Sequence, residues 1–361
     1  MSADPDKAEN ADQPAIVIRM PNWLGDCVMA MPALRHLTEA LPGARLFLAG
    51  RAQFRELMSA QAGVAGFIEA PASGPLNLIR SLPRLKKSLR AAGLAGGVDL
   101  GLLFTNSFST ALWLRGTRAR IRIGYNLNLR RPLLTHPVPC GARERARHFI
   151  NYYLWLAKLA ESVYWLEAGE PPRNGLELSA KHIDPGLEVT ARARVAAADL
   201  LHQAGINGPY AVIAPASAYG EVKDWPPEHY RQLMDSLNRE HHLSIIVTGG
   251  AAQAGVCARI AEGKERTASL AGKTSLSEFV ALLAEARLFV GGDSGGAHAA
   301  AALGTPTVAI FGVTNKQRTR PMGSKVAVLG GQTRDLDLGS PAVRELARKT
   351  LAETSPESVL V

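Results

Sequence analysis

Residues Leu288–Gly312 read LFVGGDSGGAHAAAALGTPTVAIFG, and this stretch decides the fold class. The apolar run LFVGG is followed by a glycine-rich turn, an alanine-rich helical segment and a second apolar run, TVAIFG. Two apolar runs joined by a helix of this length are typical of a βαβ unit, whose strands are parallel. The stretch therefore predicts an α/β protein built on a parallel sheet.

The same alternation continues along most of the chain. Further strands are predicted at residues 15–20, 45–50, 98–104, 121–125, 209–215 and 244–250. Helices are predicted at residues 26–41, from about 52, and at 109–116, 225–240, 258–263, 276–286 and 344–354. A largely helical stretch, 151–201, separates the two series of strands. The pattern indicates two doubly wound sheets, in which ligands bind beyond the carboxyl ends of the strands.

Four segments follow from this pattern. We expect a disordered tail at residues 1–14, an N-terminal domain at 15–175, a C-terminal domain at 176–335 and a helical segment at 336–361. The polar beginning, MSADPDKAENADQP, lacks the apolar core of a secretory signal. The sequence contains no run of 18 or more apolar residues without a charge, so it predicts no membrane span.

Three cysteines, Cys27, Cys140 and Cys257, stand far apart without any CxxC spacing. This argues against a disulfide scaffold and a structural zinc site, and it fits a cytoplasmic protein.

Positive charge is concentrated in one part of the chain. The whole sequence carries a formal net charge of +9, and residues 80–147 hold 14 Lys and Arg against only Asp99 and Glu144. A basic surface of this kind favours a polyanionic partner: a nucleic acid, an anionic membrane face or a phosphorylated acceptor. A solvated basic surface without a partner is the alternative.

The pentapeptide around Ser294, GDSGG, also occurs around catalytic serines, so the nucleophile hypothesis must be tested. The α/β context excludes a trypsin-like protease. An α/β-hydrolase needs a histidine from a distant downstream loop, but His298, one helical turn away, is the last histidine of the chain. The loop instead offers a helix N-terminus, which binds anions through free N–H groups. Asp293 or Ser294 could also simply cap this helix.

Three other loops follow predicted strands. PNWLGDCVMAMPAL (Pro21–Leu34) places Asp26 after a lone glycine, where it could cap a helix or accept a proton from a hydroxyl. PASAYGEVKDWPPEHY (Pro215–Tyr230) offers the Ser217 hydroxyl and the Lys223 ammonium. The ammonium could bind a phosphate, or Lys223 could be a solvated surface residue. VTGGAAQAG (Val247–Gly255) allows close backbone approach to a nucleotide at Gly249 and Gly250.

Taken together, these loops resemble the ADP-heptose:lipopolysaccharide heptosyltransferases, glycosyltransferase family 9. The resemblance rests on the Pro21–Leu34 and Pro215–Tyr230 motifs and on residues Leu270–Gly312, which occur in the family's order and spacing. PNWLGD and RIGYNLNLRRPLLTHPV (Arg122–Val138) look closest to the heptosyltransferase II branch.

The resemblance implies a fold and a reaction. The fold is GT-B, in which two Rossmann-like doubly wound domains face each other across a cleft. The reaction is inverting, metal-independent transfer of L-glycero-D-manno-heptose from ADP-heptose to a heptosyl-Kdo2-lipid A type acceptor. The partners are then this nucleotide-sugar donor and an anionic glycolipid at the inner leaflet of the inner membrane, with no nucleic acid.

The resemblance also implies roles for single residues. Asp26 is the expected general base, and Lys223 is expected to stabilise the leaving diphosphate. The expected donor site comprises Ser217, Lys223, Gly249, Gly250, Asp293, Ser294, Gly295, Gly296 and His298. The expected acceptor site comprises Asn22, Trp23, Arg122, Arg130 and Arg131.

Two positions depart from the family pattern. A carboxylate for the nucleotide ribose is common after the VTGG turn, whereas here Gln253 is the polar side chain of that stretch. The last strand is followed by VTNKQRTRPMG rather than Gly-Pro, which leaves donor contacts from Thr314 or Asn315 open. A different nucleotide-sugar donor, or a non-catalytic relative that binds a nucleotide or RNA, are therefore the alternative hypotheses.

Overall fold

The computed structural model describes residues 13–71, 74–172, 185–217 and 220–360. The chain divides into two compact units, Met1–Ile183 and Asp184–Val361, each with its own sheet. The predicted boundary between residues 175 and 176 and most of the predicted N-terminal tail lie outside the described residues. Each unit is therefore considered by itself.

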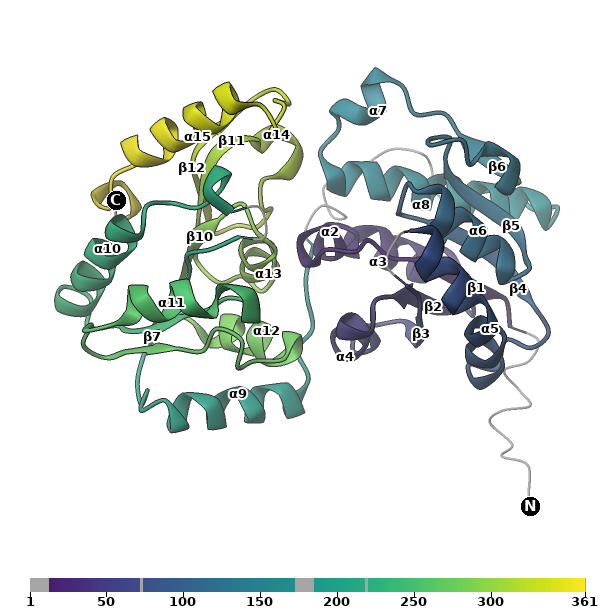
Figure 1. Ribbon diagram of the computed structural model, residues 1–361. Helices are drawn as coiled ribbons and strands as arrows, with labels where there is room; N and C mark the ends of the chain where they lie inside the picture. The colour runs from purple at the N-terminus through teal and green to yellow at the C-terminus, as the bar shows by residue number, and fades with distance from the viewer. Residues whose placement is uncertain (1–12, 72–73, 173–184, 218–219, 361) are drawn as a thin grey trace, which may run out of the picture. The chain divides into compact units, whose positions relative to one another are not determined.

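The first unit holds a six-stranded parallel sheet of order β3-β2-β1-β4-β5-β6 (Figure 1). Its strands are β1 (Ala15–Arg19), β2 (Arg45–Gly50), β3 (Val64–Glu69), β4 (Val98–Leu103), β5 (Ala119–Tyr125) and β6 (His136–Val138). Its α-helices are α2 (Leu24–Met29), α3 (Met31–Ala40), α4 (Arg55–Ser59), α5 (Pro75–Ala91), α6 (Phe108–Gly116), α7 (Ala142–Ala146) and α8 (Phe149–Glu167). Short 3₁₀ helices are η1 (Ala52–Phe54) and η2 (Arg131–Leu133).

Helices cover both faces of this sheet. Val17 of β1 packs with α5 and α6 in one apolar cluster. Successive strand residues point to opposite faces, so Ile16 and Ile18 face the other way, and they too are fully buried. Helix α8 packs on α3 and lies against β4 and β5. The first predicted sheet is thus doubly wound, as the sequence pattern indicated.

The second unit repeats this plan with the order β12-β11-β10-β7-β8-β9. Its strands are β7 (Tyr210–Ala214), β8 (Ser244–Val247), β9 (Thr267–Ser269), β10 (Leu288–Gly292), β11 (Thr307–Asn315) and β12 (Val326–Gln332). Its α-helices are α9 (Ala191–Gln203), α10 (Pro227–Arg239), α11 (Ala254–Ala261), α12 (Leu276–Glu285), α13 (Gly295–Ala302), α14 (Lys316–Thr319), α15 (Pro341–Glu353) and α16 (Glu357–Leu360). Short 3₁₀ helices are η4 (Gly220–Val222) and η5 (Ala251–Gln253).

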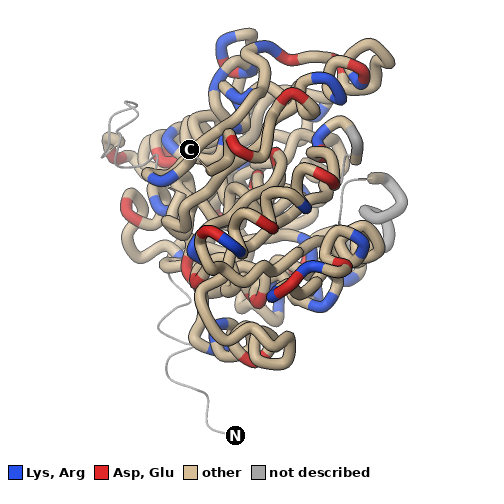
Figure 2. Tube along the Cα trace, turned by 90° about the vertical axis from the view of Figure 1, so that its left-hand side faces the viewer, with Lys and Arg blue, Asp and Glu red and all other residues tan. Residues whose placement is uncertain are grey.

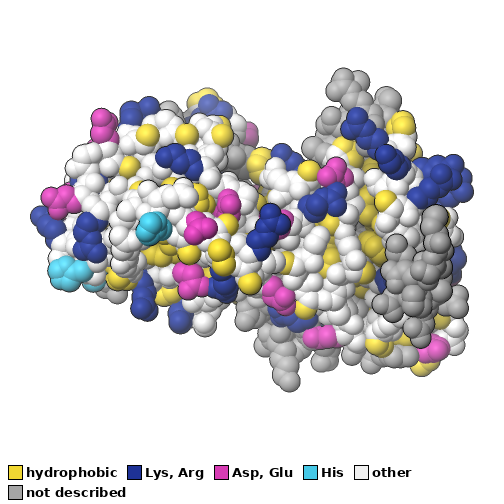
Figure 3. Space-filling view, turned by 90° about the horizontal axis from the view of Figure 1, so that it is seen from below, with side chains coloured by type: hydrophobic (Ala, Val, Ile, Leu, Met, Phe, Trp, Pro, Cys, Tyr) yellow, Lys and Arg dark blue, Asp and Glu magenta, His cyan; other side chains and the backbone are white. Residues whose placement is uncertain are grey.

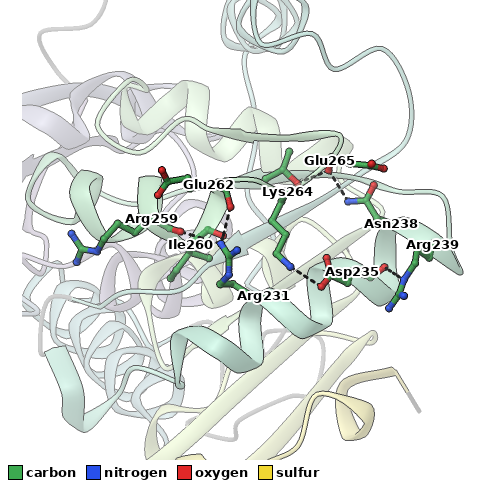
Figure 4. A network of polar contacts seen from close by, with 10 residues as sticks. Arg231, Asp235, Asn238, Arg239, Arg259, Ile260, Glu262, Lys264 and Glu265 are labelled. Carbon is green, nitrogen blue, oxygen red and sulfur yellow. Dashed lines mark hydrogen bonds and ion pairs between the residues drawn. The ribbon is translucent and has the colours of Figure 1, made fainter.

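A polar network stabilises the end of α11 in this unit (Figure 4). Arg231 of α10 donates from Nη1 to three backbone carbonyls, those of Arg259, Ile260 and Glu262. The last carbonyls of a helix lack partners within the helix, and a guanidinium can satisfy several at once. Lys264 pairs with Asp235 at 2.6 Å beside it. The network ties the segment between α11 and β9 to α10.

Several details differ from the sequence-based expectations, among them helix α5, which was not predicted. The single helix expected at residues 26–41 is broken into α2 and α3, because Pro32 cannot donate to a preceding carbonyl and instead lies in the first turn of α3. Strands β3, β6, β9 and β12 were not predicted. All four lie at the edges of the two sheets.

Both sheets have the same strand order when each is numbered within its own unit, 3-2-1-4-5-6. In this order strands 2 and 3 are added on one side of strand 1 and strands 4, 5 and 6 on the other. Ligands of such sheets bind beyond the carboxyl ends of strands 1 and 4, where the order changes side. The loops in question follow β1 and β4 in the first unit and β7 and β10 in the second.

Candidate functional site

Lys223 and Asp293 form a buried ion pair in the second unit. Lys223 Nζ lies 2.6 Å from Asp293 Oδ2, and the two side chains are 12% and 8% exposed. The pair joins the loop after β7 to the loop after β10 across 70 residues. Lys223 is therefore not the solvated surface lysine that the sequence left as an alternative.

Two glycines let the Lys223 loop lie across the ends of neighbouring strands. A Cβ on Gly292 at the end of β10 would lie 2.7 Å from the Lys223 carbonyl oxygen. A Cβ on Gly312 of β11 would lie 3.0 Å from the Val222 carbonyl oxygen. Real Cβ atoms do not come as close as 2.7 Å to a carbonyl oxygen, so the loop could not lie here with a side chain at position 292, whereas a Cβ on Gly312 would require only a small displacement.

Three buried hydroxyls gather at the carboxyl ends of β7, β10 and β11. Ser217 Oγ, Ser294 Oγ and Thr314 Oγ1 have no hydrogen-bond partner among the described residues. A buried hydroxyl without a partner costs about 1–3 kcal/mol, so native proteins rarely keep several together without a use for them. The Ser217 N–H is held by Asp224 Oδ1 at 2.7 Å, which fixes this loop.

Ser294 occupies the N-cap position of α13, yet its side chain does not cap the helix. Its backbone is extended, and no side-chain cap hydrogen bond is made. Gly295 and Gly296 form the first turn, and a Cβ on Gly296 would lie 3.1 Å from the rings of Phe279 and Phe289. His298 lies buried one turn further along α13. The N-terminus of α13 thus presents N–H groups and an uncommitted hydroxyl at the ion pair.

Gly249 and Gly250, shortly after β8, lie close to side chains of the turn and helix that follow. A Cβ on Gly249 would lie 3.0 Å from Cys257 Sγ, and one on Gly250 would lie 2.8 Å from Gln253 Oε1. The Gln253 side chain therefore folds back over the turn. The buried Cys257 sulfur gives a local reason for Gly249, whereas the flexible Gln253 side chain could move away from a Cβ on Gly250. The approach of a nucleotide to both glycines stays a prediction.

In the first unit, Asp26 lies in the first turn of α2, directly after β1. Tyr153 of α8 donates its hydroxyl proton to Asp26 Oδ1 at 3.2 Å. The sequence offered no signal for Tyr153, because 127 residues separate it from Asp26.

Arg19 supports the loop that carries Asn22 and Trp23. It is fully buried and donates to the carbonyls of Met20 and Pro71 at 2.6 Å each and to Asn22 Oδ1 at 3.2 Å. Burial lowers the pKa of Arg19 to about 10. Trp23 is 52% exposed. The signal for Arg19 was visible in the sequence, as an arginine within the apolar run AIVIRM.

The three arginines expected at the acceptor differ in exposure. Arg130 is fully buried, and it donates to the carbonyls of Tyr125 and Thr105 and to Asn106 Oδ1. Arg122 donates to the carbonyls of Leu133 and Ala119. Arg131, in η2, is exposed. Arg122 and Arg130 thus bind the chain's own loops, whereas Arg131 faces solvent.

One groove lies apart from these groups. Its volume is about 760 Å³, and Arg45, Phe47, Arg55, Phe67 and Arg90 are among its lining residues. None of the predicted site residues lines it.

The surface carries both signs of charge. Lys and Arg as well as Asp and Glu are spread over the trace (Figure 2), and hydrophobic side chains form small groups between charged ones on the face shown in Figure 3. Within the described ranges, no helix is both long and apolar enough to cross a membrane. No group of three or more His, Cys, Asp or Glu side chains among those residues is arranged to hold a metal ion.

Comparison with known proteins places these features in a family. The model of glycosyltransferase family 9 (heptosyltransferase) matches residues 83–339, more than half of the chain. Lipopolysaccharide heptosyltransferase 2 of Escherichia coli K12 is 27% identical over 350 residues, covering 96% of each chain. Lipopolysaccharide heptosyltransferase 3 of the same strain is 25% identical over 307 residues, covering 82% of each chain.

A solved structure has the same fold. The E. coli ADP-heptose lps heptosyltransferase II superimposes with a TM-score of 0.76 at 24% identity, covering 96% of each chain. The predicted fold class, GT-B with two Rossmann-like doubly wound domains, is confirmed. The chain belongs to glycosyltransferase family 9, the heptosyltransferases.

Proposed function

We propose that the protein transfers L-glycero-D-manno-heptose from ADP-heptose to the inner core of lipopolysaccharide, adding the second heptose at the cytoplasmic face of the inner membrane. The observation that carries this proposal is the Lys223–Asp293 pair, which the three unpartnered hydroxyls and the N-terminus of α13 accompany. Such a group suits a diphosphate, since ammonium, hydroxyl and backbone N–H groups all donate to phosphate oxygens. The heptosyltransferase 2 relative supports the choice of acceptor.

In this proposal Lys223 and α13 stabilise the leaving group. As the bond between the anomeric carbon and ADP breaks, negative charge grows on the β-phosphate. Lys223, the Ser217, Ser294 and Thr314 hydroxyls and the first N–H groups of α13 neutralise it. Asp293 holds Lys223 in place through the 2.6 Å ion pair. Because Lys223 supplies the positive charge, the proposed reaction is metal-independent.

Asp26 is the proposed general base in the first unit. It accepts the proton of the acceptor hydroxyl, whose oxygen attacks the anomeric carbon from the face opposite ADP. A single displacement of this kind inverts the anomeric centre. Asn22, Trp23 and Arg131 are the proposed acceptor contacts, whereas we assign Arg122 and Arg130 to holding the loops beside them, given their bonds to backbone carbonyls.

The base assignment is tested by Asp26→Asn, which keeps the shape of the side chain. Turnover of ADP-heptose with a monoheptosyl acceptor should fall by about 10²–10⁴, the usual contribution of a general base. Donor affinity, measured by calorimetry with ADP, should stay within about twofold, because Asp26 removes a proton in the transition state only. Turnover that survives within about tenfold would exclude Asp26 as the base.

The donor and the acceptor are tested separately. Gln253, which replaces a carboxylate and folds onto Gly250, leaves the nucleotide open to question. Calorimetry with ADP, UDP and GDP should give binding of ADP alone, and tight UDP binding without ADP binding would contradict the proposal. Acceptors that carry zero, one or two heptoses should show turnover only with one. Turnover with two heptoses alone would assign the third-heptose activity instead.

A further inference from the structure

The chemistry proposed above does not use the hydrogen bond between Tyr153 and Asp26. Tyr153 is buried, and its hydroxyl donates to Asp26 Oδ1 at 3.2 Å. Burial and then the charge of Asp26 raise the pKa of Tyr153 well above its usual value. The phenol therefore keeps its proton and acts as a donor toward the carboxylate.

The ring of Tyr153 is held on three sides by other aromatic rings. Its centroid lies 5.2 Å from that of Phe104, 5.7 Å from Tyr152 and 6.1 Å from Phe149. These distances fall in the range in which aromatic pairs attract one another. The hydroxyl is thus presented from a ring that packing keeps in one orientation.

Helix α8, which carries Tyr153, is itself fixed to α3. Two turns after Tyr153, Glu161 pairs with His36 of α3 at 2.8 Å, and both side chains are almost fully buried. The hydroxyl therefore belongs to a rigid element rather than to a loop. Groups mounted on packed helices hold reactive side chains more accurately than loops do.

A carboxylate in the first turn of a short helix can rotate about two side-chain bonds. A fixed donor on Oδ1 favours one of its orientations and stabilises its ionised form. A general base works only when it lies within hydrogen-bond reach of the proton it removes. At 3.2 Å the contact is longer than the usual O–H···O distance of about 2.5–3.0 Å, and catalytic contacts often shorten when substrate binds.

We propose that Tyr153 is a positioning residue that orients the Asp26 carboxylate toward the acceptor hydroxyl. The inference rests on the proposed role of Asp26 as the base. The inference adds that the rate of heptose transfer depends on the Tyr153 hydroxyl of α8. This helix lies outside the sequence motifs on which the family resemblance rests.

Three other titratable groups near Asp26, namely Cys27, Tyr152 and Arg19, keep one protonation state near neutral pH. Burial raises the pKa values of Cys27 on α2 and of Tyr152 on α8. Arg19 of β1, with a pKa of about 10, stays charged. On α3, His36 is tied to Glu161 and is present in every variant compared below.

The test is Tyr153→Phe, which removes the hydroxyl and keeps the ring. We expect kcat to fall about tenfold, a part of the contribution of the base, while KM for ADP-heptose stays within about twofold. The acid limb of the kcat/KM profile should move to higher pH, since the ionised carboxylate loses a donor. In an Asp26→Asn background, Tyr153→Phe should have no further effect on the rate.

Tyr152→Phe is the matched control. Tyr152 is equally buried, lies in the same aromatic group and accepts from Asn106 Nδ2 at 3.0 Å, but it has no bond to Asp26. It should leave both kcat and the acid limb unchanged, and the thermal midpoints of the two variants should agree within about 5 °C. Two outcomes would overturn the positioning role of Tyr153 and leave the proposed base intact. One is an unchanged acid limb in Tyr153→Phe, and the other is a rate loss that persists in full in the Asp26→Asn background. Full turnover in Asp26→Asn by itself would overturn the proposed base, and the positioning role with it.

Discussion

Ser294 shows how a single residue changes its meaning between sequence and structure. Its GDSGG context suggested a nucleophile, and the helix that follows suggested a cap. The structure places it at the N-cap of α13 with a buried hydroxyl that bonds to none of the described residues. Neither hypothesis uses the hydroxyl as the structure presents it, whereas an anion at this position would.

Ser294→Ala should therefore separate binding from folding. Without donor the thermal midpoint should not change, because the hydroxyl has no protein partner to lose. The Kd for ADP should rise about tenfold, as expected for one hydrogen bond to a charged group, with turnover retained at saturating donor. Calorimetry and a melting curve measure both effects.

Ser275→Ala provides the contrast. Ser275 caps α12 by accepting from the Glu278 N–H in a capping box, so its loss should destabilise the protein by about 1 kcal/mol without changing the Kd for ADP. A drop in stability for Ser294→Ala as large as for Ser275→Ala would identify Ser294 as a structural cap. Loss of all turnover with unchanged ADP affinity would restore the nucleophile hypothesis.

At the scale of elements, the 3₁₀ turn η4 and the strand ends beneath it behave as one structure. Lys223 reaches Asp293 from a loop whose backbone lies close to both strands, with the Lys223 carbonyl at Gly292 and the Val222 carbonyl at Gly312. The glycines of the two strands leave space for the loop backbone, and the loop carries the Lys223 ammonium. Neither glycine carries a functional group, yet both determine where the ammonium lies.

Gly292→Ala should reduce activity without unfolding the protein. The new Cβ would lie 2.7 Å from the Lys223 carbonyl oxygen, so the loop must shift, and we expect the Lys223 ammonium to be displaced with it. We expect kcat/KM for ADP-heptose to fall at least tenfold, since a displacement of about 1 Å can cost 10². Steady-state kinetics on the purified variant measures the change.

Gly208→Ala is the control for this substitution, because a Cβ there meets nothing within 4 Å. It should keep the kinetics of the unsubstituted protein. Normal activity in Gly292→Ala would mean that the position of the loop does not limit the reaction.

At the scale of the whole molecule, the uneven distribution of basic residues bears on which surface the protein binds. The 14 basic residues between positions 80 and 147 lie in the first unit, which also carries Asp26. Arg143 and Arg145 of α7 are exposed, while Arg147 lies over the Trp155 ring at 4.6 Å. We propose that the exposed arginines contribute to attraction toward an anionic lipid surface.

Arg143→Gln combined with Arg145→Gln should weaken binding to anionic vesicles. Each arginine near such a surface contributes about 1 kcal/mol, so the double substitution should lower the partition coefficient about 30-fold at low salt. Vesicle sedimentation with phosphatidylglycerol measures it, and neutral phosphatidylcholine vesicles serve as the control. Equal binding to both kinds of vesicle, or binding independent of salt, would refute an electrostatic contact.

The central strands and the edge strands were predictable to different degrees. All eight central strands, β1, β2, β4, β5, β7, β8, β10 and β11, coincide with predicted apolar runs, because strands covered by helices on both faces are largely apolar. The four edge strands were missed. They are short, as in β6 and β9, or they contain glycine and partly exposed positions, as in β3 and β12.

By itself, the sequence determined the alternation of strands and helices, the two sheets and the loops that carry Asp26, Lys223 and Ser294. Hydrophobic periodicity and glycine turns depend on residues that are close in the sequence, so they can be recognised without knowing the fold. Only the tertiary structure decided that Lys223 meets Asp293, that Tyr153 meets Asp26 and that Arg130 is buried under its own loops. The first two contacts join residues 70 and 127 positions apart, and their geometry depends on the strand order, which no local pattern encodes.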